Sequence, residues 1–160
     1  MTKVTLPHMT RHFSMTELII TNTGLENFPP LEIRNRLRLL AQYLETVRER
    51  CEGTPLIVHS GYRSKAVNAK IGGSPTSAHL LGWAADISCN SMTASSLAER
   101  IKMLGGFDQL IFEPTRGIVH VSIDPRMRGE VLTMLTEGGK RYVKGIDHFW
   151  YTRRLRANDN

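Results

Sequence analysis

The 160-residue chain lacks the features that mark a membrane protein, a disulfide scaffold or a repeat protein. No apolar run approaches the roughly 20 residues of a membrane span, and no internal repeat, low-complexity segment or linker is present. Only two cysteines occur, and we expect Cys51 to be a buried thiol rather than half of a bridge to Cys89. These absences favour a single domain over residues 1–160, long enough to bury its own core and without membrane insertion.

The first eight residues also lack the apolar core of a signal peptide. We therefore expect the chain to be made in the cytoplasm and to leave it only by another route. Lysine and arginine outnumber aspartate and glutamate by 21 to 15, which gives a formal net charge of +6. A basic surface favours an anionic partner, and nucleic acid, anionic lipid and bacterial cell wall all qualify.

Most of the basic residues are scattered, and only Arg153-Arg154-Leu155-Arg156 forms a cluster. We interpret this cluster as part of a solvated basic tail, about 152–160, and polyanion binding is the alternative. Because the sequence has no basic patch with interleaved aromatic residues and no known nucleic-acid motif, we expect no nucleic-acid partner.

The patterns along the chain predict an α+β fold, with N-terminal helices packed on a mainly antiparallel sheet. A capping box at Ser14–Glu17 predicts a short helix over 15–22, and an apolar stripe predicts a long helix from Pro30 to about Cys51. Residues 61–76 read as a loop because they contain Gly72-Gly73-Ser74-Pro75. A further helix is expected at 93–104, and strands at 56–59, 84–88, 109–112, 118–123, 131–135 and 141–143.

The most informative residues are His79 and Asp86, seven positions apart with small residues between and just before them, and His120 in a later apolar run. Two imidazoles and one carboxylate form a complete protein ligand set for a catalytic zinc ion (Zn2+) with one open position. Seven is an odd spacing, so His79 and Asp86 cannot share a strand face. We expect His79 on a loop beside the strand of Asp86, with His120 on a second strand. A hydrogen-bonded pair without metal is the alternative for His79 and Asp86.

The order of several motifs is similar to that of the zinc D-alanyl-D-alanine carboxypeptidase family, which shares its fold with the zinc domain of hedgehog proteins. The central segment Ser77-x-His79-x-x-Gly82-x-Ala84-x-Asp86 resembles the signature of this family. Residues 60–64, 68 and 72–73 resemble its upstream block, and residues 108–113 and 119–122 its last block. The resemblance covers about 13–145 and implies a hedgehog/DD-peptidase-like fold and a single peptidase domain.

The resemblance also implies roles for individual residues. His79, Asp86 and His120 would bind one zinc ion, Arg63 would bind a substrate carboxylate, and Ser77 would contact substrate or support the metal loop. Glu113 would be the general base and would later protonate the leaving amine. Where relatives have a catalytic acid three residues before the last histidine, this chain has Gly117. Glu113 reaches the site only if residues 114–117 form a tight turn, and the fallback bases are Asp108 and Asp124.

These expectations lead to a zinc metallopeptidase that cleaves a bond involving a D-amino acid in bacterial peptidoglycan, as a DD-carboxypeptidase or an endopeptidase. Small size, positive charge and the missing leader are typical of a monomeric phage or prophage endolysin that reaches the wall after the membrane is permeabilised. Periplasmic action after export is the alternative. The alternative function is a catalytically inactive zinc-binding module that binds cell wall or a protein partner.

Overall fold

The structure, a computed structural model, describes residues 8–150 and residue 154, and its centre is a six-stranded sheet. The strand order is β1-β2-β4-β3-β5-β6, and neighbouring strands are antiparallel except for the parallel pair β3 and β5. The strands are β1 (Leu56–Ser60), β2 (Ala84–Cys89), β3 (Gln109–Glu113), β4 (Ile118–Ser122), β5 (Glu130–Leu135) and β6 (Arg141–Lys144). The predicted α+β class with a mainly antiparallel sheet is confirmed.

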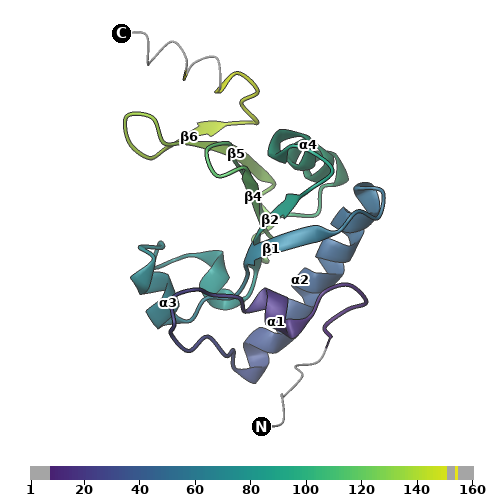
Figure 1. Cartoon of the computed structure of the whole chain (residues 1–160), viewed down its shortest axis with the longest axis vertical. Helices are drawn as coiled ribbons and strands as arrows, with labels where there is room; N and C mark the ends of the chain where they lie inside the picture. The colour runs from purple at the N-terminus through teal and green to yellow at the C-terminus, as the bar shows by residue number, and fades with distance from the viewer. Residues whose placement is uncertain (1–7, 151–153, 155–160) are drawn as a thin grey trace.

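Four α-helices and one 3-10 helix accompany the sheet in the described part of the chain. They are α1 (Met15–Leu18), α2 (Leu31–Arg50), α3 (Lys65–Lys70), the 3-10 helix η1 (Ala78–Leu81) and α4 (Ala94–Leu104). Figure 1 shows α2 and α4 together on one side of the sheet, with α3 on the other side. Within the described residues, no helix combines the length and the apolar character that crossing a bilayer requires.

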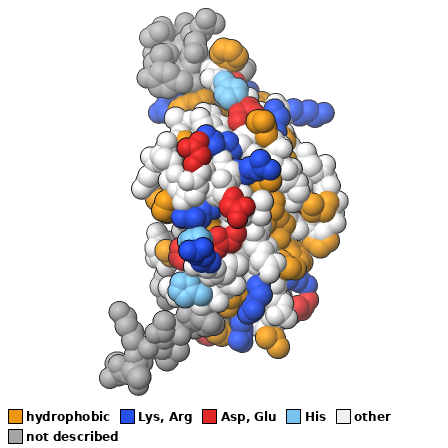
Figure 2. Space-filling model, turned by 90° about the vertical axis from the view of Figure 1, so that its right-hand side faces the viewer, with side chains coloured by type: hydrophobic (Ala, Val, Ile, Leu, Met, Phe, Trp, Pro, Cys, Tyr) orange, Lys and Arg blue, Asp and Glu red, His pale blue; other side chains and the backbone are white. Residues whose placement is uncertain are grey.

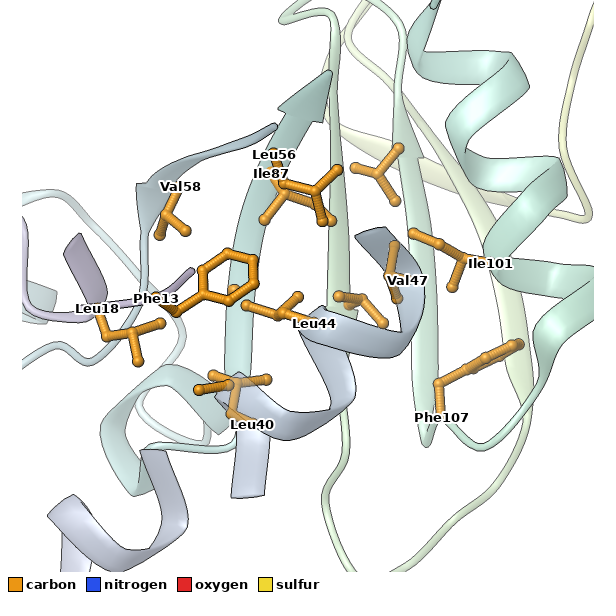
Figure 3. Packing of buried hydrophobic residues seen from close by; sticks show 14 of the residues in the cluster. Phe13, Leu18, Leu40, Leu44, Val47, Leu56, Val58, Ile87, Ile101 and Phe107 are labelled. Carbon is orange, nitrogen blue, oxygen red and sulfur yellow. The ribbon is translucent and has the colours of Figure 1, made fainter. Parts of the chain in front are cut away.

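The hydrophobic core lies between the sheet and the α2–α4 side. Side chains alternate along each strand, so Ile87, Leu110 and Val119 face the helices and pack in the core. Their counterparts from α2 include Leu44 and Val47, which are fully buried (Figure 3). The predicted apolar stripe is therefore the buried face of α2, and the polar residues on the opposite face of the sheet are left to form a site.

The outer surface on the right-hand side of Figure 1 carries side chains of both charges close together rather than a field of one sign (Figure 2). Ion pairs that involve α2 or α4 include Glu32 with Arg36 and Glu52 with Arg100. This side of the molecule is therefore a mixed-charge, solvated surface.

Two details of the sequence prediction change. The helix predicted over 15–22 ends at Leu18, because the Leu18 carbonyl accepts a hydrogen bond from the backbone N–H of Tyr62 and the chain turns away there. The loop predicted over 61–76 contains α3, whose N-cap is Ser64, with its hydroxyl accepting from the backbone N–H of Val67. The strands predicted from 131 and from 141 begin and end within one residue of β5 and β6.

Cys51 and Cys89 are buried and free, as expected for Cys51. The predicted basic tail, about 152–160, lies outside the described residues except for Arg154.

Candidate metal centre

His79 lies on η1, which is held in place at both ends. The Ser77 hydroxyl caps η1 by accepting from the backbone N–H of His79. Gly82 ends it in the left-handed conformation with φ 74°, and a Cβ there would lie 2.8 Å from Cγ2 of Ile33. Only glycine combines this backbone conformation with so close an approach to α2. The turn after His79 therefore packs directly on the helix layer, and the imidazole is buried, with 2% of the residue exposed.

Asp86 and His120 occupy directly opposed positions on neighbouring antiparallel strands. Asp86 of β2 is the Cα partner of His120 of β4, so both side chains leave the sheet on the same face. Asp86 is 2% exposed and His120 is 9% exposed. The predicted placement of Asp86 and His120 on two strands is confirmed, whereas His79, which was predicted on a loop, lies on the 3-10 helix η1.

The three side chains converge through one atom each. Nε2 of His79 lies 3.1 Å from Oδ1 of Asp86 and 3.2 Å from Nδ1 of His120. Nδ1 of His120 lies 2.9 Å from the same Oδ1. These are the only three His, Cys, Asp or Glu residues in the described chain whose ligand atoms cluster so closely, all within 4.8 Å of one another.

The tautomer of His79 indicates which kind of ion this cluster can bind. Nδ1 of His79 is 2.7 Å from the backbone carbonyl of Gly61. Because a carbonyl only accepts, Nδ1 carries the proton, and the neutral ring therefore presents the lone pair of Nε2 to Asp86 and His120. Nε2 of His79 and Oδ1 of Asp86 are then two buried acceptor atoms 3.1 Å apart, an arrangement that is unfavourable unless a cation lies beside them. The donor set of two imidazole nitrogens and one carboxylate oxygen fits Zn2+ with an open position.

The pKa shifts agree with a neutral His79 beside an ionised Asp86. Burial lowers the pKa of His79, although Asp86 acts in the opposite direction. Burial alone would raise the pKa of Asp86, but the imidazoles of His79 and His120 hold it well below its usual range. Both pKa shifts run in the direction that metal binding requires, toward a neutral His79 and an ionised Asp86.

Arg63 lies on the other side of the Asp86 carboxylate. Its Nη2 donates to Oδ2 of Asp86 at 2.9 Å, and its Nε donates to the Ser60 hydroxyl at 2.9 Å. A register shift in β1 brings Ser60 opposite Asp86. The two carboxylate oxygens of Asp86 thus have different partners: Oδ1 faces the two histidines, and Oδ2 accepts from Arg63. Nη1 of Arg63 has no partner among the described residues.

The loop before Arg63 is fixed by a close approach to α1. A Cβ on Gly61 would lie 2.2 Å from the backbone oxygen of Leu18. Nearby, the side chain of Asn27 donates to the carbonyls of Ile19 and Tyr62 and accepts from the N–H of Ser64. These contacts set the position of the Gly61 carbonyl, which in turn orients His79.

Glu113 is the last residue of β3, and the four-residue turn that it was predicted to need is present. The N–H of Gly117 donates to the Glu113 carbonyl at 2.9 Å, and β4 begins at Ile118. Glu113 is opposite Ile118, which places it diagonally across from His120 on the same face, a relation that brings Cβ atoms within about 7–8 Å. Its Oε2 accepts from Nη1 of Arg116 at 2.9 Å, and its Oε1 has no partner in the described chain.

The two fallback bases, Asp108 and Asp124, both accept hydrogen bonds from arginine side chains. Asp108 is fully buried and accepts from the backbone, Nε and Nη2 of Arg128. Asp124 accepts from Nε of Arg126 at 2.9 Å. Hydrogen bonds from these guanidinium groups lower the pKa of both carboxyls. Neither aspartate is therefore suited to take a proton near neutral pH, which leaves Glu113 as the candidate.

The metal cluster, Arg63 and Glu113 open onto one pocket of about 350 Å3. His79, Asp86 and His120 line it together with Arg63, Ser77, Glu113 and Asp108, so every candidate site residue from the sequence except Asp124 borders the same space. The pocket also includes Arg116, which pairs with Glu113, and Arg128, which pairs with Asp108, and sequence reasoning assigned neither arginine to the site. Because Arg116 follows Glu113 by three residues in a predicted turn, the sequence could have indicated the Arg116–Glu113 ion pair. No sequence spacing pointed to the second, which joins residues 20 positions apart.

Comparison with known proteins gives one match that spans most of the chain. A family model described as Peptidase M15 matches residues 11–122, which include His79, Asp86, His120, Arg63 and Glu113. The match ends with β4, so β5 and β6 lie beyond it.

Short matches to much longer curated proteins also occur. Photosystem I P700 chlorophyll a apoprotein A2 of Mastigocladus laminosus is 35% identical over 74 residues, which is 42% of this chain and 10% of that protein. A protein named apoprotein A2 2, from Trichormus variabilis, is 32% identical over 74 residues, with the same shares. The chain thus spans about a tenth of these relatives' length, and these matches carry no conclusion about its function.

Proposed function

The chain belongs to the Peptidase M15 family, as its resemblance to the zinc D-alanyl-D-alanine carboxypeptidases predicted, and we propose that it is a zinc-dependent peptidase acting on bacterial peptidoglycan. The proposed bond involves a D-amino acid and is cut by DD-carboxypeptidase or endopeptidase action. The observation that carries the proposal is the convergence of Nε2 of His79, Oδ1 of Asp86 and Nδ1 of His120 in a pocket. A phage or prophage origin, a monomeric state and action at the wall after membrane permeabilisation stay predictions.

In this proposal, His79, Asp86 and His120 hold one Zn2+ ion. Zinc bound by such a set would polarise a scissile carbonyl and lower the pKa of a water molecule beside it. Arg63 fixes the Asp86 carboxylate through Oδ2, and the Gly61 carbonyl fixes the tautomer of His79. These two contacts keep the three ligand atoms aimed at the same point.

Glu113 performs the proton transfers. Its free Oε1 accepts a proton as the water oxygen forms a bond to the carbonyl carbon of the substrate. Glu113 then donates that proton to the amide nitrogen as the C–N bond breaks, so the amine leaves neutral and a carboxylic acid product remains. The short turn over 114–117 supports this role because it keeps the carboxylate at the pocket, 7% exposed.

Arg63 and Ser77 border the space where the substrate would bind. Nη1 of Arg63 is available to donate to a substrate carboxylate while Nη2 stays on Asp86. A planar guanidinium can serve both carboxylates at once. Ser77 presents a hydroxyl at the pocket wall while it caps η1, and we assign it to a polar contact with the substrate backbone.

One observation favours the alternative, a zinc-binding module without catalysis. Oε2 of Glu113 is paired with Arg116, so one of its two carboxylate oxygens is already occupied. Against it, the Arg116 side chain is 52% exposed, so solvent screens the pair. The two functions differ in a direct test of Glu113.

The test compares Glu113→Gln with the wild type. We expect kcat on defined soluble muropeptides to fall at least about 100-fold, because a general base contributes about 10²–10⁴-fold, while zinc content stays at one ion per chain. Glu49→Gln, an exposed glutamate on α2, is the matched control and should leave kcat unchanged. An active Glu113→Gln enzyme would remove Glu113 from the mechanism, and a zinc-loaded wild type without products would favour the inactive module.

A further inference from the structure

The pocket carries more positive charge than the metal centre and Glu113 require. Five cationic side chains line it, against three carboxylates. The four arginines each have a carboxylate partner, Arg63 with Asp86, Arg116 with Glu113, and Arg126 and Arg128 with Asp108. The fifth cation, Lys140, has no carboxylate partner among the described residues.

Lys140 and Tyr142 form a small platform at the far wall of the pocket. The Lys140 ammonium nitrogen lies 5.6 Å from the centroid of the Tyr142 ring, a cation–π contact that orients the ammonium without neutralising it. Tyr142 is 48% exposed and is the cross-strand partner of Met134, which also lines the pocket. The platform therefore faces the same space as the metal centre.

The contact between two turns places this platform near Glu113. The hydroxyl of Thr115, in the β3–β4 turn, lies 3.0 Å from the hydroxyl of Thr136, in the β5–β6 turn. The first turn carries Arg116 and the second ends with Lys140. Both cations therefore border one end of the pocket, and Arg116 is already paired.

From these observations we propose that Lys140, over Tyr142, binds a carboxylate of an acidic peptide substrate at a distance from the scissile bond. The inference rests on the proposed function and names the substrate class of the same site. Three strand spacings separate β4 from β6, or about 14 Å. Extended peptide covers about 3.3–3.6 Å per residue, so the second carboxylate lies about four residues, or an equivalent length of side chain, from the bond that is cut.

The platform is a property of this chain rather than of the matched part of its family. Lys140 and Tyr142 lie beyond residues 11–122, where the family match ends. The ligands and Glu113 lie inside the match, and they would supply the chemistry. The β5–β6 hairpin would then select among peptides by their charge.

The experiment measures hydrolysis by the zinc-loaded full chain with two soluble muropeptide pools, one native and one with its carboxylates converted to amides. For Lys140→Gln we expect KM for native muropeptides to rise about threefold to fivefold, as for an exposed charge pair, with kcat and zinc content unchanged. On the amidated pool, Lys140→Gln and wild type should have the same KM. Lys144→Gln is the matched control, because Lys144 is an exposed lysine on the same face of β6 that does not line the pocket.

Binding of both pools to the chelator-treated chain, followed by calorimetry, separates the two proposals. Hydrolysis with an equal KM for Lys140→Gln and wild type on the native pool would overturn the platform and leave the peptidase. Binding that depends on Lys140 and on substrate carboxylates, without hydrolysis by the zinc-loaded chain, would support the platform and overturn the peptidase. If the chain showed no hydrolysis and no binding, both proposals would be overturned.

Discussion

A single hydrogen bond, from Nδ1 of His79 to the Gly61 carbonyl, decides which ring nitrogen faces Asp86 and His120. The sequence indicated that His79 and Asp86 belong together, but not which atoms meet. That information comes from the backbone of the 61–64 loop, which is 18 residues from His79 in the chain. The same holds for Arg63, whose Nη2 is on Asp86, a contact that the spacing of 23 residues does not reveal.

At the residue scale, Asp108 gives a prediction with a definite pH dependence. Hydrogen bonds from Arg128, opposed by burial, lower the pKa of this carboxyl in the folded state. Its contribution to stability is therefore complete above the ordinary aspartate pKa of about 3.9 and is lost as the pH falls toward the lower folded value. Asp108→Asn should lower the free energy of unfolding near pH 7 by about 1–3 kcal/mol, and less at acid pH.

Urea unfolding of Asp108→Asn and wild type from pH 7 down to pH 3 measures this difference. Glu32→Gln is the control, because Glu32 pairs with Arg36 on α2 but its side chain is 75% exposed; its cost should be about 0.5 kcal/mol or less. A loss for Asp108→Asn that is the same at pH 7 and pH 3 would show that the ionised carboxylate is not the source.

At the scale of elements, α2 and the strands follow from periodicity, whereas α3 does not. The apolar stripe from Ile33 to Val47 predicted α2 because one face of that helix meets the sheet. The six residues of α3 bury only Val67 and Asn68, too few to show a helical period. Gly72 and Gly73, which follow α3, led to the prediction of a loop. The parallel pairing of β3 and β5 could not be predicted from the sequence either, because it depends on which edge of the sheet the chain returns to.

The junction between α1 and the 61–64 loop gives a prediction at this scale. Asn27 is 7% exposed, and its side chain makes three hydrogen bonds to backbone groups of both segments. Asn27→Ala should lower the free energy of unfolding by about 2–3 kcal/mol, because it leaves buried backbone groups without partners. It should also weaken zinc affinity, since the loop carries the Gly61 carbonyl.

Urea unfolding and competition with a zinc chelator measure the two effects. Asn35→Ala, an exposed asparagine on α2, is the control and should change neither value appreciably. If Asn27→Ala lost stability but kept full zinc affinity, the loop would not control the geometry of His79.

At the scale of the whole molecule, α2 and α4 cover one face of the sheet, and a charged pocket opens on the other. The sequence predicted the α+β class and the three clustered residues because each rests on local patterns. It did not predict the arginine–carboxylate pairs around them or the contribution of β6, because these depend on how separate strands align.

If the cluster holds zinc, the ion should stabilise the entire fold. A ligand present at 100 times its Kd adds about 2.7 kcal/mol, which raises Tm by about 5–10 °C for a chain of this size. Thermal unfolding with and without zinc tests this expectation. His79→Ala should abolish the rise, whereas His59→Ala should keep it, because His59 is exposed and contacts Ser88 instead. An equal rise in both variants would place zinc elsewhere.

The most direct test of the central claim is mass spectrometry of defined muropeptides after incubation with the protein, before chelation, after chelation and after zinc is restored. The account predicts cleavage at a bond involving a D-amino acid, no cleavage after chelation, and recovery with zinc in the wild type but not in His120→Ala. The same products in undiminished yield after chelation, or with His120→Ala, would contradict it.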